Sequence, residues 1–227
     1  MKTTIKSALV ATIPVLTGYL VLGFGFGIIL NANGYGVLLA FAMSGLIYAG
    51  SMQYVAIGLI SGGASLLTAA ITTLMVNARH LFYGISMLDQ YRDTGKCKPY
   101  LIFALTDETY SLVCTDKLPV PPEHRKKYYL WVSLLNHLYW ITGSVIGAVV
   151  GSLVQFNSEG IDFALTALFL TVFLDQWLST EKHLPALIGV GASVLCLILF
   201  GSENFLIPTM LLIALLLCLY KEGDRHE

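Results

Sequence analysis

The sequence from residue 8 to residue 30, ALVATIPVLTGYLVLGFGFGIIL, contains no charged side chain. A helix rises about 1.5 Å per residue, so about 20 apolar residues cross the hydrocarbon core of a bilayer. The stretch is therefore long enough to span a membrane. Lys2 and Lys6 precede it as in a signal peptide, but it extends past the length of a signal core and has no small-residue cleavage motif. We expect it to be retained as the first membrane helix.

Composition extends this interpretation to the whole chain. Hydrophobic residues make up 56% of the 227 residues and charged residues only 12%, against roughly 25% charged residues in soluble domains. The formal net charge of −1 provides no basic surface for nucleic acid. The sequence thus predicts an all-α integral membrane protein whose main solvent is the lipid bilayer.

The apolar stretches predict one polytopic transmembrane helical bundle over residues 1–227, with seven or eight spans. We expect spans at residues 8–30, 37–60, 64–88, 129–154, 161–178, 184–200 and 205–220, and a short eighth at residues 100–114. We prefer eight, because a short basic N-terminus usually stays in the cytoplasm, although Arg92, Lys96 and Lys98 then lie outside. The alternative is seven spans with the N-terminus outside, in which only Lys2 and Lys6 violate the positive-inside rule.

A weak internal similarity emerges when residues 42–67 are aligned with residues 165–190. Ser51–Tyr54 then falls on Leu174–Trp177, and in both segments a polar pair and an aromatic residue end an apolar stretch. In duplicated transporters the interface between repeats frames the substrate site. A chance match between apolar helices is the other interpretation, and both stay open at this point.

Glycines recur at four-residue spacing in two apolar stretches, at Gly23 and Gly27 and at Gly143, Gly147 and Gly151. Residues four apart lie on one face of a helix, so these positions allow two backbones to approach closely. The first pair also mimics part of a dinucleotide fingerprint, but no strand precedes it. We expect helix packing from these glycines, and no cofactor.

Asn77, Arg79 and His80 place polar groups and a charge inside the apolar stretch 64–88. An arginine within the hydrocarbon costs several kcal/mol on insertion scales, so it needs compensation. It either snorkels to the headgroups or faces an aqueous cavity, where its planar guanidinium binds a carboxylate. We predict that these three residues contribute to substrate binding, with snorkelling as the alternative for Arg79.

Asp107 and Glu108 raise the same question in the stretch 100–114. Consecutive residues point about 100° apart on a helix, so only one of them faces a given cavity squarely. We favour Asp107 for substrate binding, because Phe103 and Tyr110 share its face. The options for the two acids are pairing with Arg79, carrying a proton for coupling, meeting a substrate ammonium, or an ordinary interfacial position.

Ser51 and Gln53 add donors and acceptors to another apolar stretch, as Asn136 and His137 do later in the chain. Interhelical hydrogen bonding and a role in a substrate site explain both pairs equally well. We predict that Ser51 and Gln53 bind substrate. An intramembrane protease using Ser51 and His80 lacks a third supporting feature, and the five histidines have no compact metal-binding spacing. We therefore expect neither an enzyme nor a metal site.

Three separated polar motifs resemble the AzlC family of branched-chain amino acid exporters in order and spacing. They are Tyr48–Gln53 (YAGSMQ), Val76–His80 (VNARH) followed by Tyr83, Gly84 and Ser86, and Thr106–Glu108 (TDE). The resemblance runs from the region of Pro14 and Gly18 to the stretch containing Asn136, Trp140 and Gly143, and the C-terminal third adds little.

The resemblance implies export of valine, leucine and isoleucine, with methionine as a further candidate, by a multi-pass protein of the bacterial cytoplasmic membrane. It also implies a partner, a small membrane subunit of the AzlD type. Substrate and direction rest on this analogy, because a family alone does not fix function.

Together these features predict a secondary transporter subunit whose solute is a zwitterion with an apolar side chain. Such a solute needs a donor for its carboxylate, an acceptor for its ammonium and an apolar pocket. Arg79 or Asn77 would provide the donor and Asp107 the acceptor. The acids and the lack of a nucleotide-binding motif favour coupling to protons. A passive channel and a non-transporting assembly subunit are the alternatives.

Overall fold

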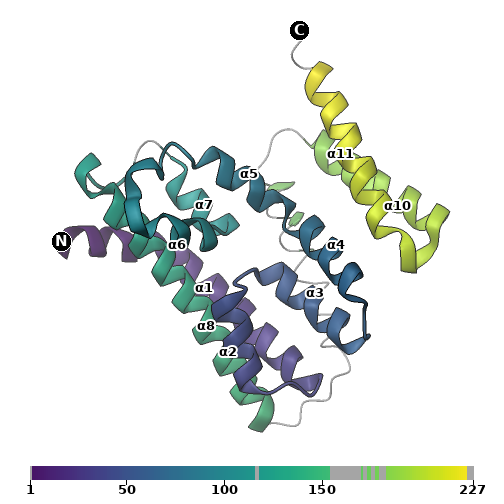
Figure 1. Ribbon diagram of the computed structural model, residues 1–227, viewed down its shortest axis with the longest axis horizontal. Coiled ribbons are helices and arrows are strands. Elements are labelled where there is room, and N and C mark those ends of the chain that lie inside the picture. Colours follow the sequence, from purple (N-terminus) through teal and green to yellow (C-terminus); the bar gives the residue numbers. More distant parts are fainter. Residues whose placement is uncertain are drawn as a thin grey trace. The chain divides into compact units, whose positions relative to one another are not determined.

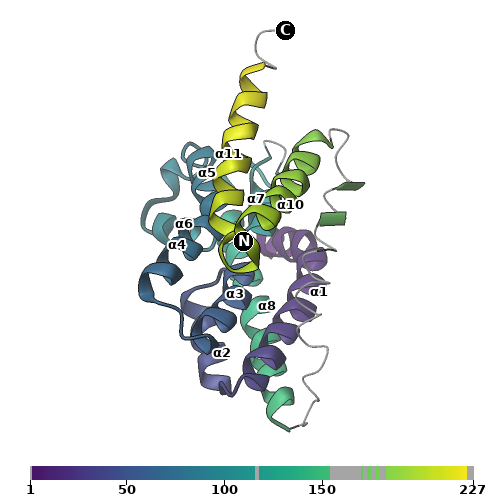
Figure 2. The ribbon, with the colours of Figure 1, turned by 90° about the vertical axis from the view of Figure 1, so that its right-hand side faces the viewer.

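The computed structural model describes residues 2–115, 118–153, 170, 173–174, 177–178 and 183–223, and the elements in these ranges are helices. The chain divides into two compact units, Met1–Leu165 and Thr166–Glu227. Each unit has its own set of helices (Figures 1 and 2).

Two long helices, α1 (Lys2–Ala32) and α8 (Arg125–Leu153), form the scaffold of the first unit. They lie side by side over much of their length (Figure 1). Both are long and apolar enough to cross a membrane, as is a third segment, Leu184–Gly201, in the second unit. The described part of the chain thus contains three helices of spanning length, and the expected seven or eight spans are not confirmed.

Glycines bring α1 and α8 into backbone contact. A Cβ atom on Gly143 would lie 2.8 Å from the carbonyl oxygen of Tyr19. A Cβ atom on Gly27 or Gly147 would overlap backbone atoms of the opposite helix. Only residues without a side chain fit at these positions, so the predicted packing role of the glycines is confirmed.

The predicted spans between α1 and α8 are each interrupted. Stretch 37–60 forms α2 (Val37–Leu46) and α3 (Gly50–Ser61), stretch 64–88 forms α4 (Leu66–Val76) and α5 (Ala78–Ser86), and stretch 100–114 forms α6 (Lys98–Phe103) and α7 (Asp107–Val113). Two short 3₁₀ helices, η1 (Arg92–Cys97) and η2 (Pro122–His124), lead into α6 and α8. Helix α2 rises only about 15 Å, about half the thickness of the hydrocarbon core. The prediction that each of these three stretches forms one continuous helix is therefore wrong.

Each interruption is marked by a particular residue. Tyr48, between α2 and α3, has a left-handed φ of 48°, which is uncommon for a residue other than glycine, and its buried ring lies 4.2 Å from the ring of His137. Asn77 both ends α4 and begins α5. Thr106 caps α7, since its Oγ1 accepts a hydrogen bond of 3.3 Å from the backbone nitrogen of Thr109.

In the second unit, α10 (Leu184–Asn204) and α11 (Leu206–Gly223) pack against each other. Gly201 adopts a positive φ of 72° and bends the end of α10. The predicted spans at residues 184–200 and 205–220 fall on these helices. The predicted span at residues 161–178 and much of the second half of the internal similarity lie outside the described residues, so both stay predictions.

Replacing Gly147 by alanine should destabilise the protein, because the added methyl group would push α1 away from α8. Overpacking of this kind costs about 1–3 kcal/mol. The matched control is Gly58→Ala on α3, where an added Cβ meets nothing within 4 Å and alanine improves helix propensity by up to about 1 kcal/mol. Thermal unfolding of the purified proteins in detergent measures both. A Gly147→Ala protein as stable as the Gly58→Ala protein would contradict the packing of α1 on α8.

Candidate functional site

Arg79 is the centre of a polar contact between three of the short helices. It lies in the first turn of α5, and its Nη1 is 2.9 Å from Oδ2 of Asp107, the first residue of α7. Its Nη2 donates a hydrogen bond of 2.6 Å to Oγ of Ser51, the second residue of α3. All three residues therefore stand just after a helix interruption, and the interruptions meet at one site.

Helix electrostatics explain why Arg79 needs a carboxylate. The first turn of a helix carries partial positive charge from its unpaired N–H groups, so an arginine there is unfavourable. Asp107 offsets both the guanidinium charge and this local field. The two side chains are 38% and 35% exposed, and in water an ion pair of that exposure contributes little to stability. The ion pair between Arg79 and Asp107 is therefore distinguished by its chemistry, and not by its contribution to stability.

Several polar atoms at the site are buried without a hydrogen-bond partner among the described residues. They are Nε of Arg79, Oδ1 of Asp107 and Oδ1 of Asn77. Buried polar groups are nearly always paired in folded proteins. One unpaired donor beside two unpaired acceptors matches a ligand that itself carries both acceptors and donors.

Glu108 points to a different set of partners from those of Asp107. Its Oε2 accepts a hydrogen bond of 2.6 Å from the hydroxyl of Tyr19 on α1. The same hydroxyl lies 2.6 Å from Oγ1 of Thr106, which in turn donates to Oγ1 of Thr109 at 3.2 Å. The amide nitrogen of Asn136 on α8 donates to Thr109 at 3.0 Å. The two neighbouring acids thus belong to two separate polar clusters.

Gln53 belongs to a third polar cluster, which is buried against α8. Its Oε1 accepts a hydrogen bond of 2.9 Å from the indole nitrogen of Trp140, and its Nε2 donates to Oγ of Ser44 at 3.2 Å. The ring of His137 lies between the backbone oxygen of Ser44, at 3.1 Å, and the hydroxyl of Tyr100, at 3.2 Å. This cluster joins α2, α3 and α6 to α8, and α3 carries Ser51 of the Arg79 site.

The structure therefore brings Ser51, Arg79 and Asp107 together. Pairing of Arg79 with Asp107 was one of the options that the sequence left open. His80 lies beside them in α5, with Nδ1 3.3 Å from the backbone oxygen of Asn77. Gln53 and Glu108 make their described contacts elsewhere. Whether any of these residues binds substrate stays a prediction.

The sequence did not reveal the hydrogen-bonding role of two aromatic residues that lie in apolar stretches. The hydroxyl of Tyr19 donates to Glu108, and the indole nitrogen of Trp140 donates to Gln53. A tyrosine or tryptophan inside a helix of spanning length is a weak signal, because its polar atom needs a partner when buried. That signal says nothing about which partner it finds.

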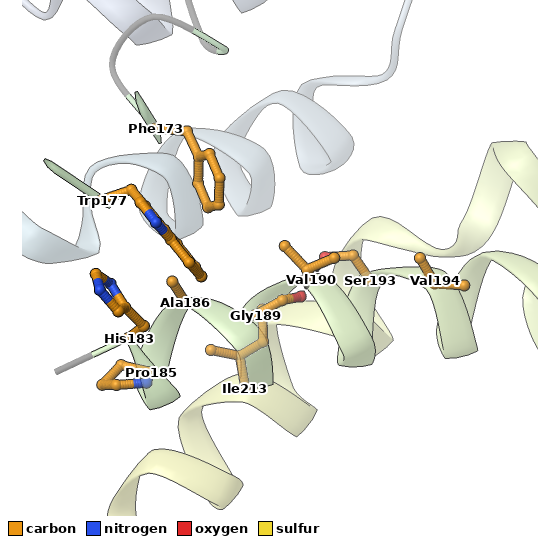
Figure 3. Close-up of a pocket in the computed structure, with 10 residues that line it drawn as sticks. All are labelled: Phe173, Trp177, His183, Pro185, Ala186, Gly189, Val190, Ser193, Val194 and Ile213. Atoms are coloured by element: carbon orange, nitrogen blue, oxygen red, sulfur yellow. Dashed lines mark hydrogen bonds between the residues drawn. The ribbon is translucent and has the colours of Figure 1, made fainter. Parts of the chain in front are cut away.

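A separate cavity of about 600 Å³ lies in the second unit (Figure 3). Figure 3 shows Phe173 and Trp177 on one side and residues of α10 on the other. The ring of His183 stacks on that of Trp177 at 4.2 Å. The described lining is mainly apolar and includes none of the predicted site residues, so it does not suit a charged solute as the Arg79 site does.

Comparisons with known proteins cover the region that holds the polar clusters. A family model described as AzlC protein matches residues 14–154. The branched-chain amino acid transport protein AzlC of Bacillus subtilis is 47% identical over 223 residues, which is 98% of this chain and 87% of the relative. An uncharacterized membrane protein of Helicobacter pylori is 43% identical over 219 residues, or 96% of this chain and 95% of the relative.

A more distant relative is the inner membrane protein YgaZ of Escherichia coli, which is 27% identical over 203 residues, or 88% of this chain and 82% of the relative. No solved structure matches the chain.

Replacing Gln53 by methionine should destabilise the protein, because the buried indole N–H of Trp140 then lacks an acceptor. An unsatisfied buried donor costs about 1–3 kcal/mol. The double variant Gln53→Met/Trp140→Phe removes both partners and should lose less stability than the two single variants summed. Thermal unfolding in detergent gives the three values. Strictly additive losses would show that the bond between Gln53 and Trp140 does not stabilise the fold.

Proposed function

Because the chain belongs to the AzlC family of membrane proteins, we propose that it is a transporter subunit that exports valine, leucine and isoleucine, with methionine as a further substrate. The name of the Bacillus subtilis relative, a branched-chain amino acid transport protein, supports the substrate class. The names of other relatives, described as membrane proteins, support the location in the bacterial cytoplasmic membrane.

The contact between Arg79 and Asp107 is the observation that carries the proposal. An α-amino acid has a carboxylate that suits a guanidinium and an ammonium that suits a carboxylate. A zwitterion placed between Arg79 and Asp107 replaces one ion pair by two. The unpaired Nε of Arg79 and Oδ1 of Asp107 are the donor and acceptor that such a ligand would use.

The surroundings of this pair also suit an amino acid. Ser51 adds a hydroxyl already bound to the guanidinium, and the unpaired amide oxygen of Asn77 adds an acceptor. The rings of Tyr83 and Tyr110 stack at a centroid distance of 4.5 Å, and Tyr83 lies within electrostatic reach of both charges. Aromatic faces of this kind provide apolar surface for a branched aliphatic side chain.

The interrupted helices agree with a transport role. In many secondary transporters the substrate site forms where membrane helices are broken, because the broken ends expose backbone and side-chain groups at depth in the bilayer. Our proposal includes coupling to protons and a small AzlD-type membrane subunit as partner. The acid pair and the absence of a nucleotide-binding motif in this sequence support proton coupling.

Export of labelled valine from cells that express the chain with its small partner tests the function. We expect export with both subunits and little with either alone. Arg79→Lys should then weaken the apparent affinity for valine by about ten- to a hundredfold, because lysine cannot reproduce the planar guanidinium contacts, worth about 1.5–3 kcal/mol.

Arg92→Lys at the start of η1 is the matched control and should leave the affinity unchanged. If Arg79→Lys, expressed at a normal level, exports valine with the wild-type rate and half-saturation, Arg79 is only a membrane anchor. A carrier also accelerates labelled efflux when unlabelled valine is supplied on the other side, so flux without such acceleration would indicate a passive channel.

A further inference from the structure

We propose that Glu108, rather than Asp107, is the proton-binding residue of this transporter, held by a buried series of hydroxyl groups from Tyr19, Thr106 and Thr109. The assignment rests on the proposed function, because it names the group through which a proton would drive transport. It divides the two acids between two tasks, substrate binding at Asp107 and proton binding at Glu108.

The different partners of the two acids support this division. Asp107 lies 2.9 Å from the Arg79 guanidinium, so a proton on Asp107 would remove the negative charge that pairs with this cation. Among the described residues, no ion pair involves Glu108, and its Oε2 meets the uncharged hydroxyl of Tyr19. A neutral partner accepts either charge state of a carboxyl group, because a hydroxyl both donates and accepts.

The direction of the hydroxyl hydrogens along the series depends on the charge of Glu108. Each hydroxyl carries one hydrogen. With Glu108 ionised, Tyr19 donates to Glu108. The hydrogen of Thr106 then serves either its contact of 2.6 Å with Tyr19, in which either atom can be the donor, or its contact of 3.2 Å with Thr109.

A proton on Glu108 sets the direction of the whole series. Protonated Glu108 donates to Tyr19, Tyr19 donates to Thr106, and Thr106 keeps its bond to Thr109. The tyrosine hydroxyl reverses its direction and no heavy atom has to move. Both charge states of Glu108 can therefore use the same side-chain positions, as a residue that binds and releases protons during a transport cycle requires.

The series is shielded from water at its inner end. Tyr19 is 4% exposed, Thr106 7%, and Thr109 and Asn136 are fully buried. Asn136 donates to Thr109, while its own Oδ1 is buried without a partner in the described part of the chain. Glu108 is half-buried at the outer end, so protons reach the series through Glu108 first.

Other ionisable groups surround Glu108 without replacing it as the proton site. The groups within electrostatic reach of Glu108 are Tyr19 of α1, Tyr48 between α2 and α3, and His80 and Tyr83 of α5. Arg79 pairs with Asp107, the residue before Glu108 in α7. Because Asp107 and Glu108 are consecutive, a shift of Asp107 toward a substrate ammonium also moves Glu108 relative to Tyr19. This linkage makes proton binding and substrate binding depend on each other.

The test uses the full chain with its small partner, reconstituted in liposomes. Wild-type protein should exchange labelled for unlabelled valine at equal pH and should also accumulate valine when a pH gradient is applied. Glu108→Gln, which mimics the neutral acid and keeps a donor and an acceptor for Tyr19, should keep exchange and lose accumulation. Tyr19→Phe should also keep exchange while accumulation slows, and Glu123→Gln, outside the series on an exposed 3₁₀ helix, should change neither.

The outcomes separate this assignment from the function on which it rests. Glu108→Gln protein that still accumulates valine from a pH gradient, or that is folded but has lost exchange as well, overturns the proton assignment alone. Wild-type protein without any valine exchange overturns the proposed function and this assignment with it. An infrared titration gives a readout independent of transport: the protonated-carboxyl absorbance that grows as pH falls, summed over all the acids, should lose in Glu108→Gln a component that Glu123→Gln keeps.

Discussion

A guanidinium in an otherwise apolar stretch is the constraint around which the first unit is organised. Arg79 requires an anion and hydrogen-bond acceptors, because water is scarce in a bilayer and an uncompensated charge is costly there. Asp107 and Ser51 supply them, and each stands at the start of a short helix that follows an interruption. The interruptions and the ion pair therefore depend on each other. Unbroken helices would not bring Arg79, Asp107 and Ser51 together. Without these side chains, the broken helix ends would expose backbone groups that have no partner.

The scaffold that holds this arrangement is the pair α1 and α8. Their glycines remove the space that side chains would occupy, so the two backbones touch. Helix α8 then offers Asn136, His137 and Trp140 as fixed hydrogen-bond partners for the shorter helices. The two long helices provide a stable frame. The short helices beside them have few contacts of their own, and segments of this kind move most readily.

The sequence predicted those parts of the structure that depend on local pattern. The long apolar stretches before residue 31 and after residue 128 formed α1 and α8, and the glycine spacing predicted close packing of helices, without identifying these two helices as partners. Pairing of Arg79 with Asp107 was among the options, because opposite charges in apolar stretches seek each other. The break at Tyr48 was not predictable, since Ile47, Tyr48 and Ala49 contain no helix breaker. That break depends on the packing of the Tyr48 ring on His137, a residue distant in sequence. The separation of Asp107 from Glu108 likewise depends on Tyr19, which only the tertiary fold brings to Glu108.

Recognition of both ends of a zwitterion by Arg79 and Asp107 is the central claim of this account. Competition in the valine exchange assay measures it most directly, using three molecules of nearly the same shape: valine, its 2-oxo acid analogue without the ammonium, and isobutylamine without the carboxylate. The account predicts that unlabelled valine competes with labelled valine and that neither analogue does at the same concentration, because each leaves one charge of the pair without a partner. Competition by either analogue as strong as that by valine would contradict it.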